Sequence, residues 1–284
     1  MRQFVLAVIN RLGAALPKRL QRFIVDFPGI LPLLQKLGGG TRVVIPTPEG
    51  LRLVINPLFH ANLQARQGLA DYEPELRSAI SALTRPGCCA YDIGANVGIF
   101  TLQFSSLVGD GGIVYAFEPE PNNSKCLLET ISRNGLKNIR FDGRAIGDSD
   151  KSSLFDRRGG AFSGRLVGNT GNHKPTRNLI EVESVSIDSL IAQEHFRAPD
   201  VMKIDVEGNE GMVLAGMKKT LANHGPAIIC ELHGHLGDSV DYVFQLLSEN
   251  NYRIYPVSEF LKTGNTPKPL TRLGNIRHVV ALKG

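Results

Sequence analysis

The chain has 284 residues, of which 42% are hydrophobic and 21% are charged. This composition excludes a disordered chain, a collagen and a coiled coil, and it is typical of a globular protein. The four cysteines include no C-x-x-C pair, so we expect neither a disulfide scaffold nor a structural zinc site. A reducing, cytoplasmic compartment is the simplest interpretation of this cysteine usage.

The net charge of +5 belongs to the first 40 residues, which hold six Lys or Arg side chains against one Asp. The remaining chain has 26 basic and 26 acidic side chains, so nucleic acid is not an expected partner. Residues 1–40 are predicted to form a basic helical arm. The arm either packs on the body or lets residues 1–38 contact an anionic membrane surface, because its apolar runs fall well short of the about 20 residues that span a bilayer.

Residues 41–70 are predicted to form a β-hairpin lead-in, with β-rich runs at 41–45 and 51–55 and a Pro- and Gly-containing turn between them. A helix is expected at 73–83. The further segment 71–284 is predicted to form the catalytic domain.

Strands and helices alternate from residue 89 onwards. The expected strands are at 89–93, 113–118, 139–142, 201–205 and 227–232, with late runs at 252–257 and 278–282 closing the sheet. The expected helices are at 98–107, 122–134, 187–194, 210–223 and 239–249. This alternation predicts an α/β, Rossmann-like fold with a mostly parallel sheet and helices on both faces. Residues 156–178 contain five Gly and five Lys or Arg, and we expect a long polar loop there.

The sequence D-I-G-A-N-V-G at residues 92–98 is the strongest local motif. It joins an apolar strand to a helix through a glycine-rich turn, where ligands of open α/β sheets bind. Glu118 ends the next strand and can accept hydrogen bonds from a ribose diol. A dinucleotide is disfavoured because the spacing is G-x-x-x-G and because Asp92 would repel a pyrophosphate. S-adenosylmethionine carries an ammonium and a sulfonium instead, and both suit a carboxylate.

Four ordered motifs resemble those of the FkbM family of S-adenosylmethionine-dependent methyltransferases. They are D-I-G-A-N-V-G at 92–98, F-E-P at 117–119, K-I-D-V-E-G-N-E at 203–210 and E-L-H at 231–233. The resemblance covers roughly residues 70–260. It implies the class I methyltransferase fold, with seven strands and an antiparallel last strand, and O-methylation of a sugar, glycan or polyketide-type hydroxyl. The cofactor contacts that it implies are Glu73, Asp92, Gly94, Ala95, Asn96, Gly98, Glu118, Pro119, Arg144, Ala145 and Asp205.

The candidate catalytic residues follow the fourth and fifth strands. Alcohol methylation needs a group that takes the hydroxyl proton. His233 is the first candidate for this base, Asp205 the second, and Glu207 lies beside them in the chain. Capping of a helix N-terminus is an alternative role for the two carboxylates. We expect no metal, because Lys203 shares a strand face with Asp205 and opposes a second cation.

The sequence therefore predicts a cytoplasmic O-methyltransferase that acts on a small-molecule or glycan acceptor. If the arm contacts a membrane, we expect the enzyme to lie on the inner face of that membrane. Two alternatives stay open at this point: a nicotinamide-dependent oxidoreductase, which Asp92 disfavours, and a membrane-docked, non-catalytic binding protein with the same fold.

Overall fold

The computed structural model describes residues 41–57, 59–64, 69–157, 164–167, 178–233, 240–262, 268–274 and 276–284. The predicted arm at 1–40 and its membrane contact lie outside these ranges. Within them, none of the helices combines the length and the apolar character needed to cross a membrane. The proposed division of the chain at residues 40 and 70 stays a prediction.

The central sheet has seven strands, and its order confirms the class I methyltransferase fold. From one edge to the other these are β12 (Tyr252–Pro256), β13 (His278–Lys283), β11 (Ala227–Glu231), β10 (Val201–Ile204), β3 (Cys89–Ile93), β4 (Ile113–Phe117) and β5 (Ile139–Asp142). β13 pairs antiparallel with both of its neighbours, whereas β11, β10, β3, β4 and β5 pair in parallel. The strand order reverses between β3 and β10, and this is where ligands bind in such sheets.

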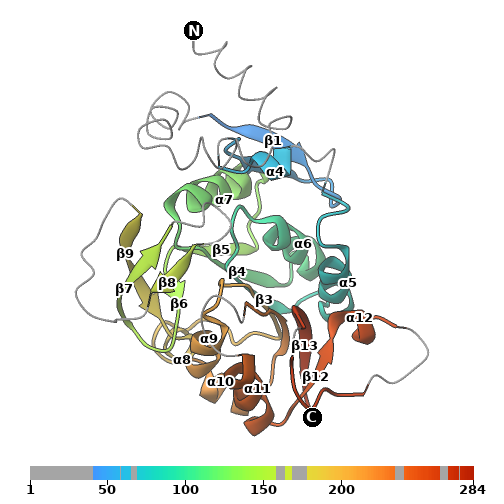
Figure 1. Ribbon diagram of the computed structural model, residues 1–284. Coiled ribbons are helices and arrows are strands. Elements are labelled where there is room, and N and C mark those ends of the chain that lie inside the picture. The colour runs from blue at the N-terminus through green and yellow to red at the C-terminus, as the bar shows by residue number, and fades with distance from the viewer. Residues whose placement is uncertain are drawn as a thin grey trace.

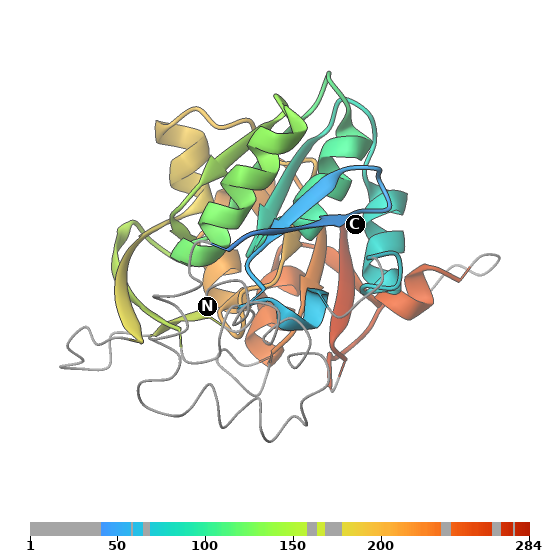
Figure 2. The same ribbon diagram turned by 90° about the horizontal axis from the view of Figure 1, so that it is seen from above.

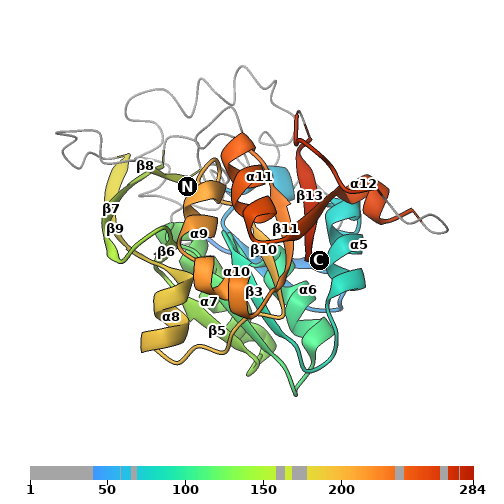
Figure 3. The ribbon, with the colours of Figure 1, turned by 90° about the horizontal axis from the view of Figure 1, so that it is seen from below.

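Helices cover both faces of this sheet (Figures 1 and 3). One face packs against α8 (Ile187–Gln193), α9 (Glu210–Ala215), α10 (Lys218–Asn223) and α11 (Val240–Glu249). The other face packs against α5 (Pro74–Leu83), α6 (Ile99–Val108), α7 (Pro121–Asn134) and α12 (Val257–Phe260). Each central strand is buried on both sides, as expected for a parallel sheet between helices.

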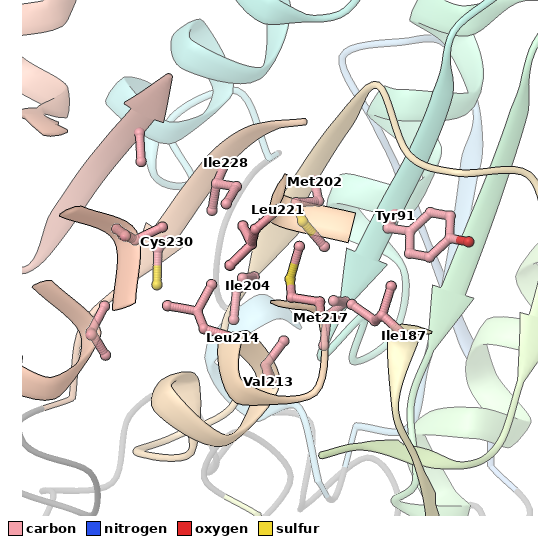
Figure 4. Close-up of a cluster of buried hydrophobic side chains, with 14 of the residues drawn as sticks. Tyr91, Ile187, Met202, Ile204, Val213, Leu214, Met217, Leu221, Ile228 and Cys230 are labelled. Atoms are coloured by element: carbon pink, nitrogen blue, oxygen red, sulfur yellow. The ribbon is translucent and has the colours of Figure 1, made fainter. Parts of the chain in front are cut away.

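The alternation of side chains along β10 decides which residues reach the site. Met202 and Ile204 point into the core beneath α9 and α10, where they pack with Leu221 and other apolar side chains (Figure 4). Lys203 lies between them in sequence and therefore points to the opposite face. On that face it is the direct neighbour of Asp92 across the β10–β3 ladder.

The helix predicted at 210–223 is wrong as one element, because α9 and α10 are separate helices. The break lies at Gly216, where an added Cβ would stand 2.0 Å from the carbonyl oxygen of Gly147. The close approach of the two backbones requires glycine at this position. A short α12 also follows β12, and the sequence did not predict it.

A second, four-stranded sheet was also not predicted. Its order is β6 (Ala145–Ile146), β9 (Leu179–Val185), β7 (Lys151–Asp156) and β8 (Arg165–Val167). It lies beside β5 at one end of the molecule (Figure 1). The expectation of an irregular loop over 156–178 is therefore wrong at Arg165–Val167, which pairs with β7. Residues 158–163 and 168–177 of this predicted loop lie outside the described ranges.

The predicted hairpin is confirmed. β1 (Val43–Pro46) and β2 (Arg52–Ile55) pair antiparallel, and a short α4 (Ala61–Gln64) follows. The hairpin lies against α7 (Figure 2). Polar side chains of α7 bind the free edge of β2: the Val54 N–H donates to Thr130 Oγ1 at 2.9 Å, and the Arg52 N–H donates to Asn134 Oδ1 at 2.9 Å. The helix thus satisfies backbone groups that an edge strand leaves open.

Candidate active site

A cavity of about 400 Å³ lies at the carboxyl ends of β3, β4 and β10. Its size is within the range of small-molecule sites. The predicted site residues that line it are Glu73, Gly94, Ala95, Asn96, Glu118, Pro119, Arg144, Ala145, Asp205 and Glu207. Gly98, Asp92 and His233 do not line it, although each touches or supports residues that do.

The glycine-rich turn after β3 forms one wall of the cavity. Gly94 has a φ of 76°, and an added Cβ would stand 1.9 Å from the carbonyl oxygen of Asp205. Glycine is required there both by conformation and by space. Asn96 also has a left-handed φ of 51°. Gly98 precedes α6, and its Cβ would meet Leu127 of α7 at 2.6 Å, so Gly98 serves packing.

Glu118 is the buried carboxylate at the end of β4, with only 5% of its surface exposed. Its Oε2 accepts the Asn96 N–H at 2.8 Å, and its Oε1 accepts the Glu120 N–H at 2.8 Å. Burial raises the pKa of Glu118 to about 7, although these two backbone hydrogen bonds favour the charged form. Two neutral backbone donors thus hold the Glu118 carboxyl group in place at the cavity wall.

Arg144 and Ala145, two of the predicted cofactor contacts, line the cavity beyond Glu118. Arg144 is oriented by two carboxylates, since its Nη2 lies 2.6 Å from Asp142 Oδ2 and its Nη1 lies 2.7 Å from Glu194 Oε1. Phe155 and Leu166 of the second sheet approach the same end of the cavity. Sequence reasoning missed both, because the strands that carry them were not predicted.

Lys203 is a buried cation that lines the cavity. Its Nζ lies 3.1 Å from Asp205 Oδ2, 3.8 Å from Asp92 Oδ1 and 5.2 Å from the ring centre of Phe100. The placement of Lys203 on the face of Asp205 is confirmed. Burial lowers the pKa of Lys203, but the charges of Asp205 and Asp92 outweigh this effect and raise it overall. Lys203 is therefore cationic.

Asp92 lies below the cavity wall and is fully buried. Its Oδ2 accepts the hydroxyl of Thr101 at 2.5 Å, and its Oδ1 faces Lys203. Burial raises the pKa of Asp92, whereas Lys203 and Thr101 oppose the shift. Asp92 does not line the cavity, and the cavity-lining residue that it faces is Lys203. Its role as a cofactor contact stays a prediction.

His233 is enclosed by three carboxylates. Its Nδ1 lies 2.9 Å from Glu210 Oε1, and its Nε2 lies 3.2 Å from Glu231 Oε1 and 3.5 Å from Glu207 Oε2. Burial by itself lowers the pKa of His233, but hydrogen bonds to Glu210 and Glu231 outweigh it and raise the pKa to about 10. A histidine that is already protonated at neutral pH cannot accept a proton. These surroundings argue against His233 as the base.

Glu207 is the carboxylate best suited to proton transfer. It lines the cavity, and burial raises its pKa to about 7, with His233 opposing the shift. A base with a pKa near the working pH is the most efficient. Glu207 also has a left-handed φ of 55°, which is uncommon for a residue with a side chain. Such backbone strain is concentrated at functional sites.

Glu231 and Glu73 complete this acidic end of the cavity. Burial raises the pKa of Glu231, but hydrogen bonds from His233, His278 and Arg277 outweigh it, so the pKa lies well below its usual range. The pKa of Glu73 is raised by burial and by the charge of Glu231. The acidic end of the cavity thus holds one carboxylate with a lowered pKa, Glu231, beside two with raised pKa values, Glu73 and Glu207.

Within the described part of the chain, two groups of residues have metal-ligand spacing: Glu73, Glu231 and His278 form one, and Asp205, Glu231 and His233 form the other. The cations Lys203 and Arg277 already neutralise Asp205 and Glu231. This charge balance is consistent with the sequence-based expectation of metal-independent transfer, which stays a prediction.

The charges and hydrogen-bond acceptors of the cavity suit S-adenosylmethionine. Gly94 lets the backbone approach a ligand, and Glu118 offers an anchored acceptor of the kind a ribose diol needs. At the other end, Glu73, Asp205 and Glu207 supply the negative charge that a sulfonium and an ammonium require.

Comparison with known proteins agrees with this fit. A family model described as the methyltransferase FkbM domain matches residues 92–254. The chain is 29% identical over 185 residues to the 31-O-demethyl-FK506 methyltransferase FkbM of Streptomyces tacrolimicus, a match that covers 55% of this chain and 70% of that protein. It is 30% identical over 162 residues to the hexuronic acid methyltransferase AglP of Haloferax volcanii, covering 56% of this chain and 61% of AglP.

Among solved structures, the methyltransferase FkbM of Methylobacillus flagellatus KT is 17% identical, with a TM-score of 0.45 over 72% of this chain and 50% of that one. That likeness is too low to decide anything further. The family match covers more than half of the 284 residues and includes the glycine turn, Glu118, Asp205, Glu207 and Glu231. The chain therefore belongs to the FkbM family and is an S-adenosylmethionine-dependent methyltransferase.

Proposed function

We propose that this methyltransferase modifies a hydroxyl oxygen of a sugar, a glycan or a polyketide-type molecule, with Glu207 as the base. The observation that carries the proposal is the position of Glu207, whose pKa is about 7, in the wall of the cavity beside Asp205. The sequence placed Glu207 among the catalytic candidates. It now takes precedence over His233, which is fully engaged by carboxylates.

When bound, S-adenosylmethionine supplies a methyl group on a cationic sulfur, which an oxygen nucleophile can accept. The residues around Glu118 orient the donor, and Glu207 accepts the proton that the acceptor hydroxyl loses as its oxygen–carbon bond forms. In-line placement of the reacting atoms contributes about 7–11 kcal/mol, and a positioned base adds about 10²–10⁴-fold. Asp205, held by Lys203, is the second candidate for the base.

The acceptor class is supported by the polarity of the cavity and by the two relatives. One relative is named for a 31-O-demethyl substrate and the other for a hexuronic acid. In this chain Arg165 lines the cavity, and its buried Nη1 has no hydrogen-bond partner among the described residues. A guanidinium nitrogen without a partner at that position suits an acidic or polyhydroxylated acceptor.

The alternative of a nicotinamide-dependent oxidoreductase is set aside by the family match, and so is that of a non-catalytic protein. The test of the proposed function is methyl transfer from isotope-labelled S-adenosylmethionine to a panel of uronic acids, neutral sugars and macrolide alcohols. We expect label in an ether of at least one hydroxylated acceptor. Label found only on nitrogen, carbon or a carboxyl ester would contradict hydroxyl methylation.

A further inference from the structure

His233 joins the end of β11 to the loop at 205–209, which connects β10 to α9. The ring is buried, and its Nδ1 lies 2.9 Å from Oε1 of Glu210, the first residue of α9. Its Nε2 lies 3.2 Å from Glu231 Oε1 at the end of β11 and 3.5 Å from Glu207 Oε2 in the loop. A side chain that does not line the cavity thus contacts two carboxylates that do, Glu207 and Glu231.

The hydrogen-bond partners of the ring require a cation. An ionised carboxylate accepts hydrogen bonds and donates none, and a neutral imidazole carries only one N–H. Asp205 adds a further negative charge to these surroundings. Glu231 in turn also faces Arg277 and His278. Because both ring nitrogens of His233 face carboxylate oxygens, both contacts are hydrogen bonds only when the ring is doubly protonated.

The loop at 205–209 bends through two consecutive left-handed residues. The φ angles are 55° at Glu207 and 100° at Gly208. A residue with a side chain keeps such a conformation only where the contacts around it over-determine it. Here Glu210 Oε1 accepts the Gly208 N–H at 2.9 Å, and the same oxygen faces His233 Nδ1. One buried carboxylate therefore connects the left-handed turn to the ring.

We propose that His233 is a positioning residue for methyl transfer, which holds the 205–209 loop through Glu210 and keeps the Glu207 carboxylate at the cavity. The inference rests on the proposed role of Glu207 as the base, and it adds the group that places that base. The histidine of the E-L-H motif at 231–233 then orients the base and does not itself take the proton.

A cation at this position also affects the protonation of Glu207. Burial raises the pKa of Glu207 to about 7, and His233 opposes this shift. Burial lowers the pKa of His233, but its carboxylate partners outweigh burial and raise it to about 10, so the ring stays charged while Glu207 titrates. Replacing the ring by a neutral amide should therefore raise the pKa of Glu207 further. A histidine that only fills space would leave that pKa unchanged.

The test replaces the ring by amides of two lengths and follows the ¹³C signals of labelled glutamate carboxyl groups against pH, in the presence of a chelator. In His233→Asn the amide extends as far as Nδ1 and can still donate to Glu210. In His233→Gln it extends as far as Nε2 and loses that bond. We expect both variants to raise the Glu207 midpoint by about one pH unit, or about tenfold in proton affinity, because both lack the charge. Glu207→Gln identifies the signal.

Hydrogen exchange of the Gly208 N–H distinguishes the two variants. It should be about tenfold faster than wild type in His233→Gln, because Glu210 loses the partner that holds it, and unchanged in His233→Asn. His278→Gln is the matched control, since it removes the other histidine beside Glu231, 3.4 Å from Oε2, and should change neither measurement.

An unmoved Glu207 midpoint in both His233 variants, or an equal shift in His278→Gln, would overturn the proposal. Wild-type exchange of Gly208 in His233→Gln would also overturn it. The ¹⁵N spectrum of the wild-type histidine rings needs no variant: two protonated ring nitrogens on His233 at pH 8 would support the proposal, and a neutral ring would refute it.

Turnover by Glu207→Gln separates this proposal from the proposed function. Wild-type turnover in that variant would remove Glu207 as the base. The midpoint, exchange and ¹⁵N measurements concern His233 and need no acceptor, so they decide its role whichever acceptor is methylated.

Discussion

The two ends of the cavity compensate their buried carboxylates in different ways. Around Glu118 the compensation comes from backbone N–H groups and a neutral amide. Around Glu231 it comes from cations, namely His233 and Arg277. Neutral donors leave a carboxylate free to accept further hydrogen bonds from hydroxyls, which suits a ribose. Cations fix the charge of Glu231 firmly and leave Glu207, their neighbour, as the group that titrates near neutrality.

The largest effect that distinguishes the two ends is expected in Glu207→Gln. Loss of the base should lower kcat by about 10²–10⁴-fold while leaving the affinity for S-adenosylhomocysteine nearly unchanged. The folded pKa of Glu207 is about 7, so wild-type kcat/KM should fall as pH drops below that value, where the base takes up a proton. Steady-state kinetics and calorimetry on the same preparations would check this. A kcat within threefold of wild type would remove Glu207 from the role.

Lys203→Met tests whether the cation at the acidic end is required for folding. Removing one partner of a buried ion pair costs about 3–5 kcal/mol, because the remaining charge is left uncompensated. The pKa of Asp92 is raised in the fold, so the penalty should grow as pH rises through that pKa and shrink at low pH. Thermal unfolding at pH 5 and pH 8 would show it.

The matched control is Asp92→Asn combined with Lys203→Met, which should recover part of the loss. Equal melting temperatures for Lys203→Met and wild type at pH 8 would show that the buried ion pair of Lys203 and Asp92 does not stabilise the fold.

Glu118→Ala addresses the neutral end. We expect a loss of about 1–3 kcal/mol in cofactor binding, or roughly fivefold to 150-fold, because the ribose hydroxyls and the Asn96 N–H lose their acceptor. Glu75→Ala, an exposed carboxylate in the first turn of α5, is the control. Calorimetric titration with S-adenosylhomocysteine measures both. Equal affinities in the two variants would refute the assignment.

Arg165→Ala should have the smallest effect. Arg165 lies in the cavity wall with its Nη1 unpartnered among the described residues, so its loss should raise the KM for an anionic acceptor by about threefold to tenfold. The KM for S-adenosylmethionine should not change, and Arg165→Lys should recover part of the acceptor affinity. An effect confined to the cofactor would place Arg165 at the donor end instead.

The central sheet could be predicted because its strands are continuous apolar runs, such as Cys89–Ile93, that are bounded by turn residues. The second sheet could not be predicted as easily. β7 is largely polar, and β9 alternates Ile180, Val182 and Ser184 with exposed glutamates, a half-buried pattern that was present but weak. The break at Gly216 depends on a contact with Gly147, far away in sequence.

The motif residues Gly94, Glu118 and Glu207 do line the cavity, and their roles in the site stay predictions. The sequence did not reveal the protonation state of His233. The position of His233 two residues after Glu231 correctly brought the two together, but Glu207 and Glu210 also reach the ring. These carboxylates raise the pKa of His233, and they reach the ring because Glu207 lies in the loop between β10 and α9 and Glu210 begins α9.

The most direct test of the account is a crystal structure with S-adenosylhomocysteine bound. We predict that both ribose hydroxyls lie on the Glu118 carboxylate, that the adenine lies beside Arg144 and Ala145, and that the sulfur faces the end of the cavity lined by Asp205 and Glu207. A ligand whose ribose is turned away from Glu118, or whose sulfur lies at the Arg144 end, would contradict the assignment of the two ends.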